Sequence, residues 1–327
     1  MTPLQFEALY QDEWQELERL LDRVLRRKND PKRSKAPVQG ERIAALYRRA
    51  CEQLALARAR SYPAYLLDRL DRLTADAHQV IYQQREIGIA ALWRIFSRDF
   101  PRAVRAEAGY VWTATMLFVL PTVVMGFLVY GQPDLILSVV DAATVAEFEQ
   151  MYSAAAESIG RTREAGSDWT MFGFYISNNI GVAFQCFASG LAAGLGSIFF
   201  LIYNGALAGA VAGYLTERGL GASFYSFVVT HAAFELTAIV LSGAAGLKLG
   251  HALLAPGRRT RLQSLVHAAK ECVVVVYGVT AMLVVAAAFE AFWSSAPWLP
   301  HSVKYGVAGV CWVAVFAYLV LQGRHAD

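Results

Sequence analysis

The residues best suited to chemistry in this 327-residue sequence are polar side chains set inside long apolar runs. His231 and Glu235 are four residues apart in one run, a spacing that puts both on one face of a helix. An imidazole and a carboxylate one turn apart can hydrogen-bond, share a proton, or supply two of the three or more ligands that a metal ion needs. With them we group four amides of neighbouring runs as a candidate polar cluster: Asn178, Asn179, Gln185 and Asn204.

Polar groups in lipid are costly, so each member of this cluster needs a partner. We predict that His231, Glu235, Asn179 and Asn204 approach one another as a clamp that fixes helix packing. Handling of a proton or substrate, and binding of a metal, are the alternatives. A metal would need a further ligand, for which the two asparagines are weak candidates. Glu290, near the outer end of its own run, is expected to be interfacial.

No catalytic motif accompanies these residues. The sequence contains no H-E-x-x-H pair, nucleophile elbow, P-loop or dinucleotide fingerprint. Its four cysteines show no C-x-x-C spacing, and three of them lie in apolar runs. We therefore expect no enzymatic activity, no cofactor, no resident metal and no disulfide.

The elements that must position the cluster are membrane-spanning helices. Apolar residues make up 56% of the chain, and mean hydropathy is +0.34, which is high for a soluble protein. Residues 172–214 carry no charged side chain; as one helix they would be about 65 Å long, twice the thickness of a bilayer core, so the chain must fold back once. The sequence predicts about six spans, at residues 110–130, 172–193, 195–214, 224–247, 272–293 and 303–321.

The fold class predicted is therefore all-α, a polytopic membrane helix bundle preceded by a charged third. Apolar residues at helical spacing predict a cytoplasmic helical bundle over 1–92. Residues 110–322 are predicted to form the transmembrane domain, with 131–171 as a periplasmic loop. The first 30 residues lack an apolar core segment, so no cleavable signal peptide is expected.

Residues 93–109 mix aromatic and basic side chains just before the first span. This pattern favours an amphipathic helix in the headgroup layer over nucleic-acid binding. Basic residues also crowd the connection after the fourth span, whereas the 131–171 loop is acidic, so both termini are predicted to be cytoplasmic. The expected location is the bacterial cytoplasmic (inner) membrane. The residues expected to anchor the helix at the membrane surface are Trp93, Arg94, Arg98, Arg102 and Arg105.

Small residues form a second pattern. Gly205, Gly209 and Gly213 follow one another at four-residue steps, and Gly190 and Gly194 share that spacing at the turn between the second and third spans. Such ridges let helices approach closely. The spacing leaves open whether the neighbouring helix lies in the same chain or across a dimer.

The order of these features resembles the stage II sporulation protein M family of bacterial membrane proteins. In the membrane part the resemblance rests on Asn178-Asn179, the glycine-rich turn, Asn204-Gly205, and His231 with Glu235, where Ala232 replaces the glycine of a His-Gly-x-x-Glu pattern. In the soluble part, Leu46 to Arg49, Leu54 to Arg60 and Ala77 to Tyr82 look like the family's cytoplasmic helices. The similarity is expected to cover nearly the whole chain.

The resemblance implies a non-catalytic scaffold or assembly partner linked to cell-envelope processes. It also suggests partners such as a MoxR-type AAA+ ATPase and von Willebrand factor A-like proteins. Separately, we expect a homo-oligomer, with a dimer favoured. The alternatives are a transporter or lipid-handling protein that uses the polar cluster as its binding site, and an intramembrane metalloenzyme.

Overall fold

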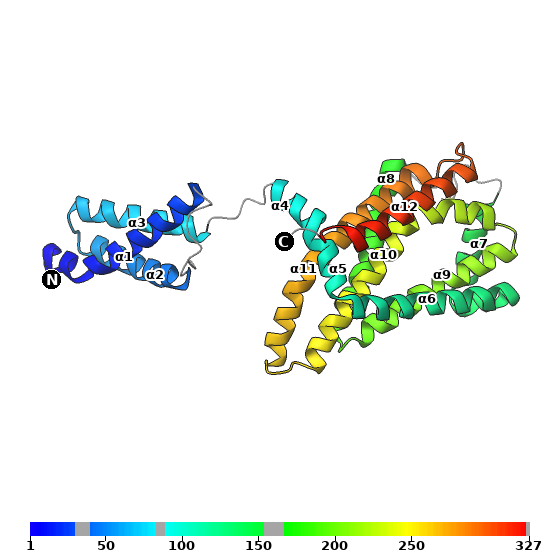
Figure 1. Ribbon diagram of the computed structural model, residues 1–327, viewed down its shortest axis with the longest axis horizontal. Helices are drawn as coiled ribbons and strands as arrows, with labels where there is room; N and C mark the ends of the chain where they lie inside the picture. The colour runs from blue at the N-terminus through cyan, green and yellow to red at the C-terminus, as the bar shows by residue number, and fades with distance from the viewer. Residues whose placement is uncertain (30–39, 83–88, 154–166, 325–327) are drawn as a thin grey trace. The chain divides into compact units, whose positions relative to one another are not determined.

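A computed structural model of the chain describes residues 1–29, 40–82, 89–153 and 167–324 (Figure 1). Within these ranges the structure is helical and contains no β-strand, which confirms the all-α prediction. The chain divides into two compact units, Met1–Gly88 and Ile89–Asp327. Each unit has a hydrophobic core of its own.

The first unit consists of three helices, α1 (Pro3–Asn29), α2 (Gly40–Ala59) and α3 (Ala64–Tyr82). Their apolar stripes meet in one core, in which Trp14 is buried and donates its indole N–H to Gln53 Oε1 at 2.6 Å. Ion pairs such as Arg42 with Glu16, at 2.6 Å, join the helices at the surface. The linker expected between the first two helices, residues 30–39, lies outside the described residues.

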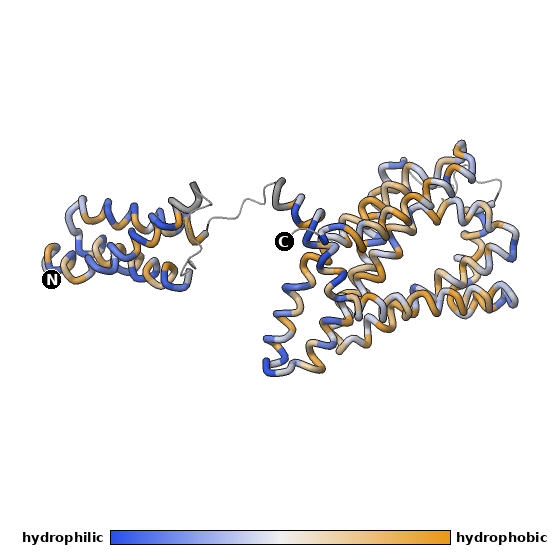
Figure 2. The backbone as a smooth tube through the Cα atoms, in the orientation of Figure 1, coloured by the Kyte–Doolittle hydropathy of each residue, from blue (hydrophilic) through white to orange (hydrophobic). Residues whose placement is uncertain are grey.

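The second unit is a bundle of long apolar helices with short connecting segments. Hydrophobic residues dominate along the long helices, whereas in the first unit hydrophilic and hydrophobic residues alternate (Figure 2). Its elements are α4 (Ile89–Arg94), η1 (Ile95–Asp99), α5 (Phe100–Ala106), α6 (Ala108–Gly131), η2 (Pro133–Ser138), α7 (Ala142–Tyr152), α8 (Asp168–Ala188), η3 (Ser189–Leu191), α9 (Leu195–Glu217), α10 (Gly221–Leu254), α11 (Arg261–Ala288), η4 (Phe289–Ser294) and α12 (His301–Leu321).

Five segments among the described residues are long and apolar enough to cross a membrane. They are α6, α9, α10, α11 together with η4, and α12. The predicted span at 172–193 corresponds to α8, which is not among the five. The count of six spans is therefore not supported by composition, because the amides of α8 reduce its hydropathy.

The packing of α6 and α9 nevertheless shows where α8 runs. Gly205 faces Phe118, Gly209 faces Thr122, and Gly213 faces Gly126, so residue numbers rise together on the two helices. The helices are thus parallel, and the chain must return to its starting end between them. The 21-residue helix α8 is about 31 Å long and provides that return.

The predicted glycine ridge lies along the same contact. A Cβ atom built on Gly205, Gly209 or Gly213 would lie 2.1–2.3 Å from a carbonyl oxygen of α6, so only glycine permits this approach. The neighbouring helix therefore belongs to the same chain. The turn after α8 is similarly close to α10, because a Cβ atom on Gly190 would lie 2.1 Å from the oxygen of Gly246. Gly194 begins α9 with a left-handed φ of +85°.

The segment expected as one interfacial helix is helical from Ile89 to Ala106, with the π-helical η1 inserted between α4 and α5. Trp93 is 73% exposed, and Arg94 pairs with Asp99 at 3.5 Å. Arg102 and Arg105 turn toward the end of α12, where they donate to the carbonyl oxygens of Gly323 at 2.7 Å and Leu319 at 2.6 Å. These two arginines thus satisfy C-terminal helix carbonyls, a structural role that the sequence did not suggest.

The predicted 131–171 loop contains helical structure, η2 and α7, in its first part. Asp141 begins α7 by accepting hydrogen bonds from the backbone amides of Ala143 and Thr144, both at 3.0 Å. Buried residues such as Val145 and Tyr152 pack α7 against α9 and α10. Residues 154–166 of this loop lie outside the described residues.

Candidate functional site

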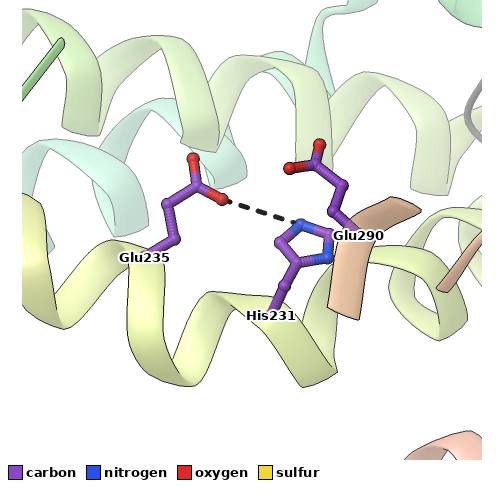
Figure 3. A group of neighbouring side chains, drawn as sticks. All are labelled: His231, Glu235 and Glu290. Atoms are coloured by element: carbon purple, nitrogen blue, oxygen red, sulfur yellow. Dashed lines mark ion pairs between the residues drawn. The ribbon is translucent and has the colours of Figure 1, made fainter. Parts of the chain in front are cut away.

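The helix that carries His231 and Glu235, α10, is the most buried of the five candidate spans and contacts α6, α8, α9, α11 and α12. The two side chains lie on one face, as their spacing predicts, with Nε2 of His231 3.8 Å from Oε2 of Glu235 (Figure 3). The His231 side chain is only 5% exposed and that of Glu235 is 21% exposed. A distance of 3.8 Å is too long for a hydrogen bond, so the pair is adjacent without being bonded.

Glu290, expected from the sequence to be interfacial, is the third member of this site. It lies in η4, and one of its carboxylate oxygens is within 4.8 Å of ligand atoms of both His231 and Glu235. Phe234 stacks on Phe289 with ring centroids 5.6 Å apart. This stacking places the residues that follow them, Glu235 and Glu290, side by side. Because η4 is a π-helix, its extra residue per turn changes the direction of the side chains after Phe289.

The same π-helical segment orients the imidazole. Ser294 Oγ is 3.2 Å from Nδ1 of His231, and both residues are buried. The carbonyl oxygen of Ser294 accepts a hydrogen bond from the ammonium of Lys304 at 2.7 Å. Lys304 is fully buried, and among the described residues no carboxylate lies within ion-pair distance of it. This lysine was not predicted to be a functional residue, although it is the one charged residue between Val303 and Leu321.

The amides expected in the cluster divide into two groups. Asn179 is 2% exposed and donates through Nδ2 to Oε2 of Glu290 at 3.4 Å, while its Oδ1 accepts from the exposed Asn178 at 3.1 Å. Gln185, six residues along α8 from Asn179, points about 120° away and is exposed. Asn204 donates to the carbonyl oxygen of Phe200 on its own helix at 2.7 Å and makes no hydrogen bond to the cluster. Among the described residues, Gln185 and Asn204 thus make no hydrogen bond to His231, Glu235 or Asn179.

Aromatic side chains cover the site toward α7. The ring of Phe227 is edge-on to the His231 ring, with centroids 5.2 Å apart. Tyr152 of α7 packs in turn against Phe227, with centroids 6.0 Å apart. Burial of the Tyr152 phenol, together with the nearby carboxylate of Glu290, raises its pKa well above the ordinary value. The site thus combines one imidazole and two carboxylates under an aromatic cover.

His231, Glu235 and Glu290 are the only group of three or more histidine, cysteine or acidic side chains in the described ranges with metal-binding spacing. Each offers one nitrogen or oxygen ligand of the kind that zinc and similar divalent ions accept. Without a metal, the same three groups could share protons or clamp α10 to η4. We refer to these three residues below as the His-Glu-Glu site.

A second polar group lies near the other end of α10. The ammonium of Lys248 contacts the carboxylate of Glu107 and that of Glu271, the latter at 2.7 Å. Nearby, Tyr110 hydrogen-bonds to Nδ1 of His251. These contacts join the start of α6, the end of α10 and the start of α11. They are a structural clamp, since each charged group has an opposite partner.

Comparison with known families gives two matches. The model described as stage II sporulation protein M matches residues 114–295, and a domain of unknown function (DUF8413) matches residues 4–83. The expectation that the first resemblance covers nearly the whole chain was therefore wrong in extent, because the N-terminal helices match a different model. No curated protein and no solved structure matches the chain.

Proposed function

The chain belongs to the stage II sporulation protein M family, and from this premise we propose that it is a non-catalytic scaffold of the bacterial cytoplasmic membrane. In this proposal the membrane unit anchors the protein, partner proteins bind the N-terminal unit in the cytoplasm, and the assembly serves a cell-envelope process. The protein would act as a homodimer. The resemblance suggests a MoxR-type AAA+ ATPase and von Willebrand factor A-like proteins as partners.

The observation that carries this proposal is the division of the chain into two units with separate cores. The N-terminal unit matches its own family model, so it is a module in sequence as well as in structure. It presents charged helix surfaces and several exposed apolar side chains, among them Leu4 and Leu9 at 74% and 58% exposure. A self-contained module joined to a membrane anchor is the organisation expected of a docking protein.

The charge distribution supports a cytoplasmic position for this module. Residues 1–108 contain 20 basic and 15 acidic residues, whereas residues 131–171 contain seven acidic residues and two basic ones. The side of a membrane protein that is richer in lysine and arginine faces the cytoplasm. Both termini would then be cytoplasmic, since α12 returns the chain to the end at which α6 began.

The proposal can be tested by photocrosslinking in intact cells with the full chain. A genetically encoded diazirine side chain at Leu9 should give a discrete adduct with a cytoplasmic protein, identified by mass spectrometry. The matched control is Leu17, eight residues further along α1, which is 1% exposed and should give no such adduct. Absence of any adduct at Leu4 and Leu9, or adducts only with extracytoplasmic proteins, would refute the docking role.

A variant of the His-Glu-Glu site separates the scaffold from a transporter or metalloenzyme. Glu235→Gln keeps the shape and hydrogen-bonding capacity of the side chain. A scaffold carrying this change should still form the Leu9 adduct. In a transporter or metalloenzyme the same change would abolish function in a chain that remains folded.

A further inference from the structure

We propose that His231, Glu235 and Glu290 bind one small divalent cation of the zinc class, which ties α10 to the π-helical segment η4. This inference is independent of the scaffold proposal, because the ion would hold the membrane unit together whatever the N-terminal unit binds. The ligand atoms would be Nε2 of the imidazole and one oxygen from each carboxylate. At least one further coordination position would remain for water.

The spacing of the three side chains suits a shared ion better than it suits direct bonds. Their ligand atoms all lie within 4.8 Å of one another. Ligands about 2.0–2.2 Å from a tetrahedral zinc ion are roughly 3.2–3.6 Å apart. The 3.8 Å between Nε2 of His231 and Oε2 of Glu235 is close to this separation. Small rotations of the side chains would therefore bring all three onto one ion.

The imidazole provides a second observation that points to a ligand. The His231 side chain is 5% exposed, and its Nε2 faces the carboxylates without a hydrogen bond to any described residue (Figure 3). Nδ1 is engaged by Ser294 at 3.2 Å. If Nδ1–H donates to that hydroxyl, the lone pair on Nε2 faces Glu235 and Glu290. A metal-binding histidine is held in the same way, by a hydrogen bond from its other nitrogen.

The carboxylate of Glu290 is held in a similar way, by a hydrogen bond from a supporting side chain. Asn179 donates to Oε2 of Glu290 at 3.4 Å, so an amide from a third helix, α8, fixes this side chain. Lys304 holds Ser294 in place through the Ser294 carbonyl oxygen. Three helices and η4 thus contribute to a preformed set of ligands and supporting groups, as metal sites require.

Charge also favours a cation. Glu235 lies among apolar helices, where an ionised carboxylate is costly unless a positive charge accompanies it. Among the described residues no lysine or arginine forms an ion pair with Glu235, and its ion-pair partner is His231 at 3.8 Å. A divalent ion would supply a positive charge at this carboxylate. The rings of Phe227 and Tyr152, which cover the site, would then limit the access of water from the side of α7.

The test uses full-length, tag-free protein in detergent, stripped with a chelator and then dialysed against limiting Zn²⁺. Mass spectrometry of the metal content should give one zinc per chain, and the melting temperature should rise when Zn²⁺ is restored. Glu235→Gln and Glu290→Gln should each reduce the bound zinc at least tenfold. Glu147→Gln, an exposed acid on α7, is the matched control and should retain full binding.

Asn179→Ala provides a graded readout. Because Asn179 only supports Glu290, its loss should weaken zinc binding about 10–100-fold without removing the site. Substitution with Co²⁺ gives a further check, since a d–d absorption spectrum reports nitrogen and oxygen ligation even in a variant of reduced stability.

Two results would overturn the proposal. The first is a wild-type chain that retains no stoichiometric zinc and whose melting temperature does not respond to the ion; the three groups would then share protons. The second is equal zinc content in the wild type, Glu235→Gln and Glu290→Gln, which would mean an adventitious ion only.

Discussion

The glycine ridge between α6 and α9 allows one sharp prediction, the effect of Gly209→Ala. A Cβ atom at this position would lie 2.1 Å from the oxygen of Thr122 and 2.8–2.9 Å from two further backbone atoms of that residue. Ordinary contact begins at 3.4 Å, so the overlap is about 1.3 Å. The atoms in the way are backbone rather than a flexible side chain, and therefore the helices themselves must separate.

The expected cost follows from two opposing terms. Overpacking of this severity costs about 3 kcal/mol, at the upper end of the usual range. Replacing glycine by alanine inside a helix returns up to about 1 kcal/mol. The net loss of unfolding free energy should be about 2 kcal/mol. Gly205 and Gly213 pack equally closely on either side, so α9 cannot tilt to relieve the overlap at one point.

The assay is unfolding in mixed micelles, followed by circular dichroism as denaturing detergent is added. Gly181→Ala on α8 is the matched control, because no atom lies within 4 Å of a Cβ atom there. That variant should be as stable as the wild type or more stable. If Gly209→Ala and Gly181→Ala behave alike, the close approach of α6 and α9 is refuted. Elution volume should not change in either variant, since this contact lies within one chain.

Three further predictions concern other parts of the chain. Lys248→Met removes the ammonium between Glu107 and Glu271 and should lower the unfolding free energy by roughly 2 kcal/mol, whereas the exposed Lys270→Met should change it little. Hydrogen bonds from the backbone and hydroxyl of Thr144 hold the pKa of Asp141 below its ordinary 3.8. The Asp141 cap therefore stabilises α7 above pH 3.8, and this stabilisation is lost as the pH falls through the lower pKa of the folded state. Amide exchange in α7 should show this loss, and Asp141→Ala should abolish the pH dependence. An impermeant thiol reagent on intact cells should label Ser153→Cys and not Ser264→Cys; the reverse pattern would overturn the proposed orientation.

The sequence was informative where one physical signal dominates. Long uncharged runs can only be buried in lipid or in a large core, so all six predicted spans correspond to helices, and five of these are long and apolar enough to cross a membrane. The four-residue spacing of Gly205, Gly209 and Gly213 identified a packing face, because few other uses of glycine recur at that period. Neither signal named the neighbouring helix. That required the parallel arrangement of α6 and α9, which depends on contacts across the whole bundle.

The polar site was predicted only in part, for a local reason. Periodicity placed His231 and Glu235 on one face, but Glu290 lies 55 residues beyond Glu235, and its direction depends on a π-helical turn. No helical-wheel argument includes such a turn. One signal was available: Phe234-Glu235 and Phe289-Glu290 repeat the same dipeptide in two apolar runs, and the two phenylalanines stack. Gln185 and Asn204 were included because polarity alone does not reveal which face a side chain occupies.

The low hydropathy of α8 has a consequence for the biogenesis of the protein. A segment carrying Asn178, Asn179 and Gln185 gains too little from lipid to leave the translocon by itself. It is followed after a short turn by the strongly apolar α9. We therefore expect α8 to remain in the translocon until α9 has been synthesised. The two helices should then enter the bilayer together as a helical hairpin. Asn179 would then reach Glu290 only after α11 has emerged, which makes this contact one of the last to form during synthesis.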